Sequence, residues 1–177
     1  IVAATRKAGE FFRKIKYKMN SVKDVMVVGG GEIGHYLCEQ LIRSGMSVKL
    51  IEKDPARCET LCATLDDGVA VINGDASDQN ILVESGLEQT GAFVALTNLD
   101  EENILLSLFA KSVCDCKCVT KINRIGFDNV ISKLDLDTII NPKSITSDTI
   151  VRYVRAMSSS RGSNMETLYN VIKGKVE

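Results

Sequence analysis

The chain has 177 residues, with 22 Lys and Arg against 23 Asp and Glu, and 45% of its residues are hydrophobic. This length suits one ordinary domain with a short appendage, and the composition excludes a disordered chain, a collagen and a disulfide-stapled mini-protein. A net charge of −1 argues against a nucleic-acid binder, and no apolar run approaches the ~18 residues that a membrane span needs. We therefore expect a soluble, cytosolic protein.

The first 21 residues differ from the rest, because six basic side chains face a single acid, Glu10. Phe11, Phe12 and Ile15 give this stretch a narrow apolar stripe, which is typical of a short basic helix. It is either a linker from a preceding domain or a helix that docks on an acidic partner or on anionic lipid. The globular domain is expected to start at Val22.

From Asp24 onward, short continuous apolar runs alternate with segments whose apolar residues recur at helical spacing. The runs predict strands, and the spaced segments predict helices that cover both faces of a parallel sheet. Because crossovers between parallel strands are right-handed, this order predicts an α/β fold with a Rossmann-like, doubly wound, six-stranded sheet. The expected strands are Val25–Val28, Val48–Ile51, Val69–Ile72, Ala92–Leu96, Cys118–Ile122 and Thr138–Ile140; the expected helices are Glu32–Ser44, Pro55–Leu65, a short one around Ile81–Val83, Asp100–Val113, Phe127–Leu134 and Ser144–Met157.

A G-x-G-x-x-G motif follows the first expected strand and opens the first expected helix, with glycines at 29, 31 and 34. Gly29 permits the tight turn, Gly31 lets the main chain approach a pyrophosphate, and Gly34 lets the helix pack closely on the strand. Free N–H groups at the helix N-terminus, together with the helix dipole, then bind the phosphates. The motif predicts a dinucleotide site.

Glu52 ends the second expected strand, 18 residues beyond Gly34. A carboxylate there accepts hydrogen bonds from the adenosine ribose and repels a 2′-phosphate, which favours NAD(H) or an adenine nucleotide over NADP(H). Lys53 weakens this preference slightly, and a plain solvated role for Glu52 is the alternative. Asp54 is better explained as the N-cap of the helix that Pro55 opens.

Two further segments follow strands at the same predicted edge of the sheet, where ligands bind in open α/β folds. Asp75 and Ala76 follow the third strand, where the adenine ring would lie, and a structural turn is the alternative. Thr97 and Asn98 end the fourth strand. Capping of the next helix by Asn98 or Asp100 competes with a ligand role for this segment.

Six cysteines occur in a chain large enough to have a core, so a disulfide framework is not expected. Cys114, Cys116 and Cys118 would share one face of an extended segment. A metal site would need a fourth ligand, and it usually shows C-x2-C pairs or a nearby histidine. We favour ordinary semi-buried thiols over metal or redox chemistry, and no metal is assigned.

A dehydrogenase needs a general acid or base and a substrate pocket, usually from a second domain. Only twenty residues follow Met157, no Ser/His/Asp or Cys/His arrangement lies at a strand end, and the single histidine, His35, receives no role. The leading interpretation is a non-enzymatic nucleotide-sensing module without catalytic residues. The alternatives are the cofactor half of an NAD-dependent oxidoreductase and a structural Rossmann domain with an empty site.

Five segments resemble the nucleotide-binding lobe of the TrkA family, the RCK (or KTN) class of regulatory subunits of Trk-type potassium uptake systems. The glycine motif is common to all Rossmann folds, whereas Asp75-Ala76 and the stretch after the fourth strand are more particular to this family. The resemblance covers roughly residues 22–157 and is carried by Val27–Gly34, Ile51–Cys58, Gly74–Asp78, Ala95–Asn103 and Lys121–Arg124.

The resemblance implies the organisation of the chain as well as its fold. It is similar to the second of two tandem lobes, with residues 1–21 as the connection from a preceding domain. Residues 22–157 would form the nucleotide-binding N-terminal domain, and residues 158–177 a linker and the start of a truncated C-terminal small lobe. The helix Ser144–Met157, whose apolar residues include Ile145, Ile150 and Val154, would then pair subunits, with simple packing on the sheet as the alternative.

The resemblance also implies the ligand, the partners and the site. The ligand would be NAD(H), with ATP or ADP as the other candidates. The partner would be a membrane potassium transporter of the Trk type, regulated by dimers or rings at the cytoplasmic face of the membrane. The implied contacts are Gly29, Gly30, Gly31, Glu32, Ile33 and Gly34 for the phosphates, Glu52 for the ribose, Asp75 and Ala76 for adenine, and Thr97, Asn98 and Lys121 for the far side of the site.

Overall fold

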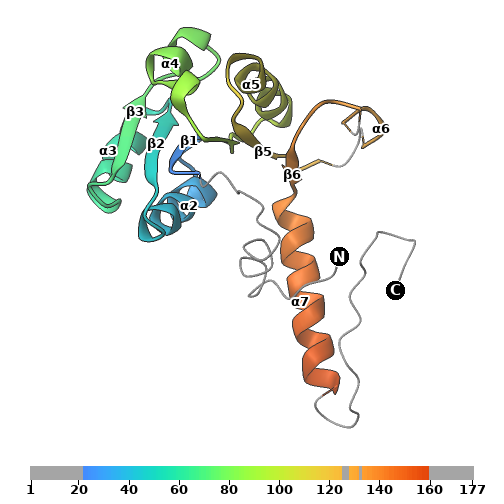
Figure 1. The fold of residues 1–177 in the computed structure, drawn as a ribbon. Coiled ribbons are helices and arrows are strands. Elements are labelled where there is room, and N and C mark those ends of the chain that lie inside the picture. The colour runs from blue at the N-terminus through green and yellow to red at the C-terminus, as the bar shows by residue number, and fades with distance from the viewer. Residues whose placement is uncertain (1–21, 125–127, 132, 160–177) are drawn as a thin grey trace, which may run out of the picture.

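The computed structural model describes residues 22–124, 128–131 and 133–159. The basic helix expected within residues 1–21 and the small-lobe segment expected from residue 160 onward lie outside the described residues. The chain folds into one parallel sheet with helices between its strands (Figure 1).

Six parallel strands form the sheet in the order β3-β2-β1-β4-β5-β6, which confirms the predicted doubly wound topology. The chain starts at the centre, builds outward to β3, and then crosses back to place β4 on the other side of β1. The strands are β1 (Asp24–Val28), β2 (Ser47–Glu52), β3 (Val69–Asn73), β4 (Ala92–Ala95), β5 (Lys117–Lys121) and β6 (Thr138–Ile140).

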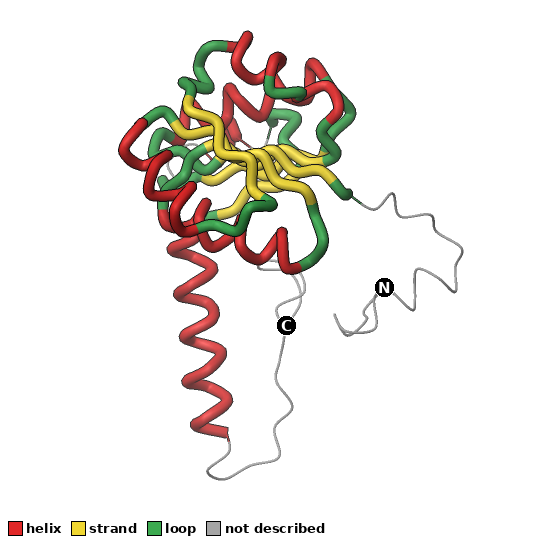
Figure 2. Tube along the Cα trace, turned by 90° about the vertical axis from the view of Figure 1, so that its left-hand side faces the viewer, coloured by secondary structure: helices red, strands yellow, loops and turns green. Residues whose placement is uncertain are grey.

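Helices cover both faces of the sheet, as Figure 2 shows with the strands between two helical layers. Because side chains alternate along β1, Val25 and Val27 pack with one layer while Met26 and Val28 pack with the other. The helices are α2 (Glu32–Arg43), α3 (Pro55–Thr64), α4 (Gln79–Glu84), the 3-10 helix η2 (Leu87–Gln89), α5 (Asp100–Val113), α6 (Asp128–Ile131) and α7 (Pro142–Ser159).

The three cysteines near β5 contribute to the core. Cys116 and Cys118 are buried in the cluster beneath α5, and Cys114 packs against it. Burial raises the pKa of the Cys114 thiol to about 12, so this thiol stays protonated and unreactive near neutral pH. No group of three or more potential metal ligands is found among the described residues.

Helix α7 starts earlier than the sequence predicted. Pro142 occupies its first position, because its fixed φ suits that place, and the Asn141 side chain accepts the main-chain N–H of Ser144 at 3.0 Å as a cap. The helix also continues through Ser159, two residues into the polar stretch expected to be a linker. It projects from the body of the domain (Figures 1 and 2).

One face of α7 is apolar and exposed. Ile150, Tyr153 and Val154 recur at helical spacing and are 57%, 65% and 58% exposed. Packing on the sheet, the alternative interpretation of this helix, does not cover these side chains. In the described part of the chain no helix is both long enough and apolar enough to cross a bilayer.

Candidate functional site

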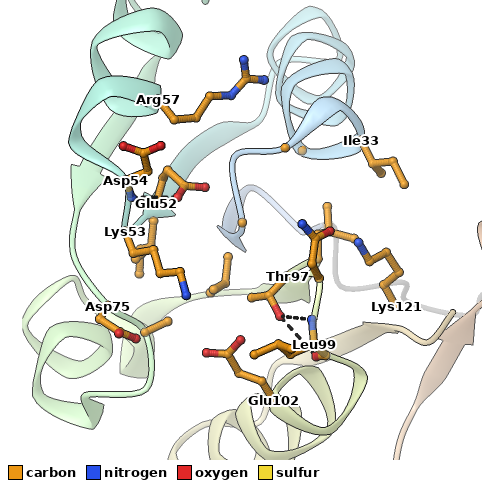
Figure 3. A pocket seen from close by; sticks show the side chains of 18 of the residues that line it. Ile33, Glu52, Lys53, Asp54, Arg57, Asp75, Thr97, Leu99, Glu102 and Lys121 are labelled. Carbon is orange, nitrogen blue, oxygen red and sulfur yellow. Dashed lines mark hydrogen bonds between the residues drawn. The ribbon is translucent and has the colours of Figure 1, made fainter. Parts of the chain in front are cut away.

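A cleft of about 650 Å³ lies at the carboxyl edge of the sheet (Figure 3). It lies beside β1 and β4, between which the direction of winding reverses. All of the predicted site residues except Gly30 line it. Its walls are Val28, Gly29, Gly31, Glu32, Ile33, Gly34, Ile51, Glu52, Lys53, Asp54, Arg57, Gly74, Asp75, Ala76, Leu96, Thr97, Asn98, Leu99, Glu102 and Lys121.

Packing or backbone conformation requires glycine at some positions of the motif and not at others. Gly29 has a φ of +102°, and a Cβ there would lie 2.9 Å from the Leu96 carbonyl carbon. A Cβ on Gly34 would overlap the carbonyl oxygen of Gly29, because the first turn of α2 packs directly on the loop. A Cβ on Gly31 meets no protein atom within 4 Å, and its φ is an ordinary −64°. The protein's own packing therefore requires Gly29 and Gly34 but leaves open space beside Gly31.

The peptide groups of Gly30 are held from both sides. Its N–H donates to Glu52 Oε2 at 2.7 Å, and its carbonyl oxygen accepts Arg57 Nε at 2.7 Å. A Cβ on Gly30 would lie 2.5 Å from Leu61 Cδ1, so this glycine faces α3 rather than the cleft. Gly30 was expected to contact phosphate; in this structure it does not line the cleft, and its N–H and carbonyl oxygen are bonded to Glu52 and Arg57.

Glu52 retains acceptor capacity toward the cleft. Its Oε2 accepts the Gly30 N–H, and its Oε1 accepts the main-chain N–H of Asp54 at 2.9 Å. A carboxylate has about four lone-pair positions, so these two bonds leave others for a hydroxyl. Asp54 caps α3 as predicted, by accepting the N–H of Ala56 at 3.0 Å.

Asp75 lines the cleft while it also organises its own turn. Its Oδ1 accepts the main-chain N–H of Ser77 at 2.9 Å, and this hydrogen bond lowers the pKa of Asp75. Ala76 beside it is buried in the core. The turn and the wall of the cleft are thus the same structure, and the two interpretations of Asp75 do not exclude each other.

Asn103 joins the ends of β4 and β5. Its buried side chain accepts the N–H and the hydroxyl of Thr97, at 2.8 and 2.9 Å, and donates to the carbonyl oxygens of Thr97 and Lys121, at 3.1 and 2.9 Å. Asn103 thereby sets where Thr97 and Lys121 stand. The sequence signal for this role is an amide on the buried face of α5, in line with Leu106 and Ala110.

Neither Asn98 nor Asp100 caps α5, contrary to one of the sequence interpretations. Leu99 is the N-cap residue and makes no side-chain capping bond, while Thr97 Oγ1 accepts the N–H of Leu99 at 3.3 Å. Asp100 instead accepts the N–H groups of Asn123 and Arg124, at 2.9 Å each. Although partial burial raises the pKa of Asp100, these hydrogen bonds outweigh it and lower the pKa.

Lys121 is a buried cation in the wall of the cleft, only 5% exposed. Burial lowers the pKa of its ammonium, and the negative charge of Asp100 opposes this effect. Figure 3 shows the side chain reaching from β5 toward the middle of the cleft.

Sequence reasoning did not assign Arg57, Leu99 or Glu102 to the site. Arg57 approaches from α3, and its Nη2 lies 3.3 Å from Glu32 Oε1 across the glycine loop. Arg57 lies five residues after Glu52, and the dinucleotide-binding motif places no nucleotide-site residue at that spacing. Leu99 and Glu102 lie at the start of α5. An acid such as Glu102 is common there because it interacts favourably with the helix dipole, so it gave no sign of a role in the site.

Sequence comparison places the chain among proteins of one kind. The TrkA-N domain family matches residues 25–142. The chain is 38% identical over 133 residues to the Trk system potassium uptake protein TrkA of Haemophilus influenzae, covering 75% of this chain and 29% of that protein. It is 32% identical over 178 aligned positions to TrkA of Vibrio alginolyticus, covering 98% of this chain and 38% of that protein. The chain thus spans between 29% and 38% of the length of these two relatives.

Structural comparison shows the same fold. The TrkA-N domain of the inner membrane protein ybaL from Escherichia coli superposes with a TM-score of 0.66 at 18% identity, over 77% of this chain and 99% of that one. The GsuK channel bound to NAD gives a TM-score of 0.62 at 15% identity, over 81% and 27%. GsuK bound to ADP gives 0.61 at 19% identity, over 76% and 34%. The family match across most of the sheet, the identity to TrkA proteins and the shared fold together show that the chain belongs to the TrkA-N domain family.

Proposed function

We propose that this chain is a non-enzymatic regulatory lobe that binds NAD(H), with ATP or ADP as the other candidates, and controls a membrane potassium transporter of the Trk type. The relatives that bear the Trk name, and the NAD and ADP found in GsuK, support this assignment. The lobe works at the cytoplasmic face of the membrane, through differential affinity of the nucleotide for two states of the assembly.

The observation that carries the nucleotide site is the open space at Gly31. Glycine there is required by no neighbour and by no backbone angle, yet it stands at the N-terminus of α2, where free N–H groups attract an anion. Glu52 lies one strand away with acceptor capacity left for a ribose. A diphosphate against Gly31 and a ribose at Glu52 fit this geometry together.

Calorimetric titration of the chain with NADH, NADPH and ATP tests the site. We expect NADH or ATP to bind and NADPH to bind much more weakly, because its 2′-phosphate meets the Glu52 carboxylate. Glu52→Gln should narrow the difference between NADH and NADPH, whereas Glu59→Gln, an exposed change on α3 away from the cleft, should not. Equal affinity for NADH and NADPH in the parent chain would contradict the assignment.

The chemistry of the cleft favours binding without turnover. The only histidine of the sequence, His35, does not line the cleft: its Nε2 lies 3.8 Å from Glu39, and its ring stacks on Tyr36. A module of this kind leaves NADH unchanged, so the dinucleotide recovered after incubation should be chemically intact.

We further propose that α7 pairs two copies of the lobe. The exposed stripe of Ile150, Tyr153 and Val154 is the apolar surface that a second identical helix would cover. Sedimentation of the chain should show a dimer, and Ile150→Asp with Val154→Asp should give monomers with unchanged NADH affinity. A monomeric parent chain at all concentrations would refute the pairing. Arg152→Ala on the same helix serves as the control.

A further inference from the structure

The order and spacing of the strands fix how far apart the residues along the cleft lie. Neighbouring strands lie about 4.8 Å apart, and the carboxyl edge runs from β3 through β2, β1 and β4 to β5. Glu52 ends β2, the glycine loop follows β1, and Lys121 ends β5. A dinucleotide with its first ribose at Glu52 and its diphosphate over the glycine loop therefore lays its second nucleoside over β4 and β5.

The half of the cleft over β4 and β5 combines apolar side chains with one buried cation. Ile33 and Leu99 line it with 41% and 55% exposure, and the Lys121 ammonium reaches into it from β5. In Figure 3 the Glu102 carboxylate points toward Lys53 and Asp75, on the other side of the cleft. The second base thus meets a positive charge between apolar walls.

The positive charge of Lys121 is only partly offset by nearby acids. No carboxylate of the described residues lies within the 4.0 Å ion-pair distance of its ammonium. The acid whose charge reaches it, Asp100, is already bound by the N–H groups of Asn123 and Arg124. A charge that is 5% exposed is weakly screened, so it acts strongly on a neighbouring charge.

We propose that Lys121 determines the charge of the second base that the cleft accepts, so that an uncharged base, as in NADH, binds more tightly than a cationic base, as in NAD+. This inference rests on the proposed nucleotide site. The two forms differ by one positive charge on the nicotinamide ring, and the rest of the molecule makes the same contacts with Glu52 and the glycine loop.

Competitive titration with NADH, NAD+ and ADP tests the inference on the whole 177-residue chain. In the parent chain NADH should bind at least about tenfold more tightly than NAD+, as expected for two like charges that lie within about 12 Å of each other at an effective dielectric of about 20. Lys121→Met should bring the two affinities to within about twofold of each other, and Lys121→Arg should keep the difference. Lys53→Met, a cation on the adenine side, should change both affinities by the same factor.

Each outcome separates the inference from the site on which it rests. Failure of NADH, NAD+ and ADP alike to bind the parent chain would reject the nucleotide site itself. Binding of all three with equal NADH and NAD+ affinities, or a preference that survives Lys121→Met, would overturn only the role of Lys121. ADP has no second base, so its affinity reports what Lys121→Met does to the diphosphate alone, and the ratio of NADH to NAD+ affinity should fall by more than the affinity for ADP changes. Loss of ADP binding in that variant would place Lys121 against the diphosphate and would equally overturn the inference.

Discussion

Replacing Gly31 by alanine should weaken ligand binding without destabilising the fold. A methyl group at Gly31 meets no protein atom within 4 Å, and the backbone angle there suits alanine. The change restricts the unfolded chain, which stabilises by ~0.4–1 kcal/mol, but it also loses the preference for glycine over alanine at an N-cap, which costs a similar amount. We therefore expect the free energy of unfolding to stay within about 1 kcal/mol of the parent value.

The same methyl group occupies the space proposed for the diphosphate. Forcing an extra methyl into a filled site costs about 1–3 kcal/mol, which weakens NADH binding about 10- to 100-fold. Gly34→Ala is the matched control, because its methyl would overlap the Gly29 carbonyl oxygen in the unliganded protein. That variant should lose both stability and binding.

Urea denaturation and NADH titration of both variants separate the two effects. Retention of parent-like NADH affinity in Gly31→Ala would refute the placement of the diphosphate. A loss of stability in Gly31→Ala as large as that in Gly34→Ala would refute the distinction between a glycine kept for the ligand and a glycine kept for packing.

Three further predictions concern stability and the thiols. Because the pKa of Asp100 is lowered in the folded protein, the stability that its carboxylate contributes is present above the unfolded pKa of about 3.9 and is lost as pH falls through the folded pKa. Between pH 7 and pH 3 the denaturant midpoint should therefore fall more steeply for the parent than for Asp100→Asn. Parallel curves for the two proteins would contradict this. Asn103→Leu leaves the Thr97 N–H and the Lys121 carbonyl oxygen without their partner. At ~1–3 kcal/mol for each buried group, this change should lower the free energy of unfolding, measured in urea, by more than about 2 kcal/mol. A smaller loss would mean that water replaces the amide. Exposed Cys62 should react with a thiol reagent in the native protein, while Cys38, whose pKa burial raises to about 11, should react only after unfolding; rapid native labelling of Cys38 would show that α2 opens.

The sheet was predictable from the sequence because its signals are local. Continuous apolar runs such as Val25–Val28 mark buried strands, and right-handed crossovers between such strands favour a doubly wound sheet. Helix ends were less certain: the sequence placed the start of α7 at Ser144, whereas the helix starts at Pro142. The Asn141 cap that marks this start is a contact, which no pattern in the sequence shows.

Within the site, residues with a fixed spacing from the strands were predictable, and residues that arrive from elsewhere were not. Gly31 and Glu52 follow strands β1 and β2 directly, so the topology alone brings them together. Arg57 reaches Gly30 only because α3 packs where it does, and Gly30 faces Leu61 of the same helix rather than the cleft. Such positions depend on packing between elements, which one sequence does not encode in any short motif.

The amide of Asn103 ties the position of α5 to the rim of the cleft. One side chain of α5 bonds the main chain of Thr97 and of Lys121, so α5 cannot shift relative to that rim without breaking these hydrogen bonds. The outer surface of the same helix carries Leu105, which is 67% exposed. A partner that displaced α5 from that surface would therefore have to displace Thr97 and Lys121 as well, or break their bonds to Asn103.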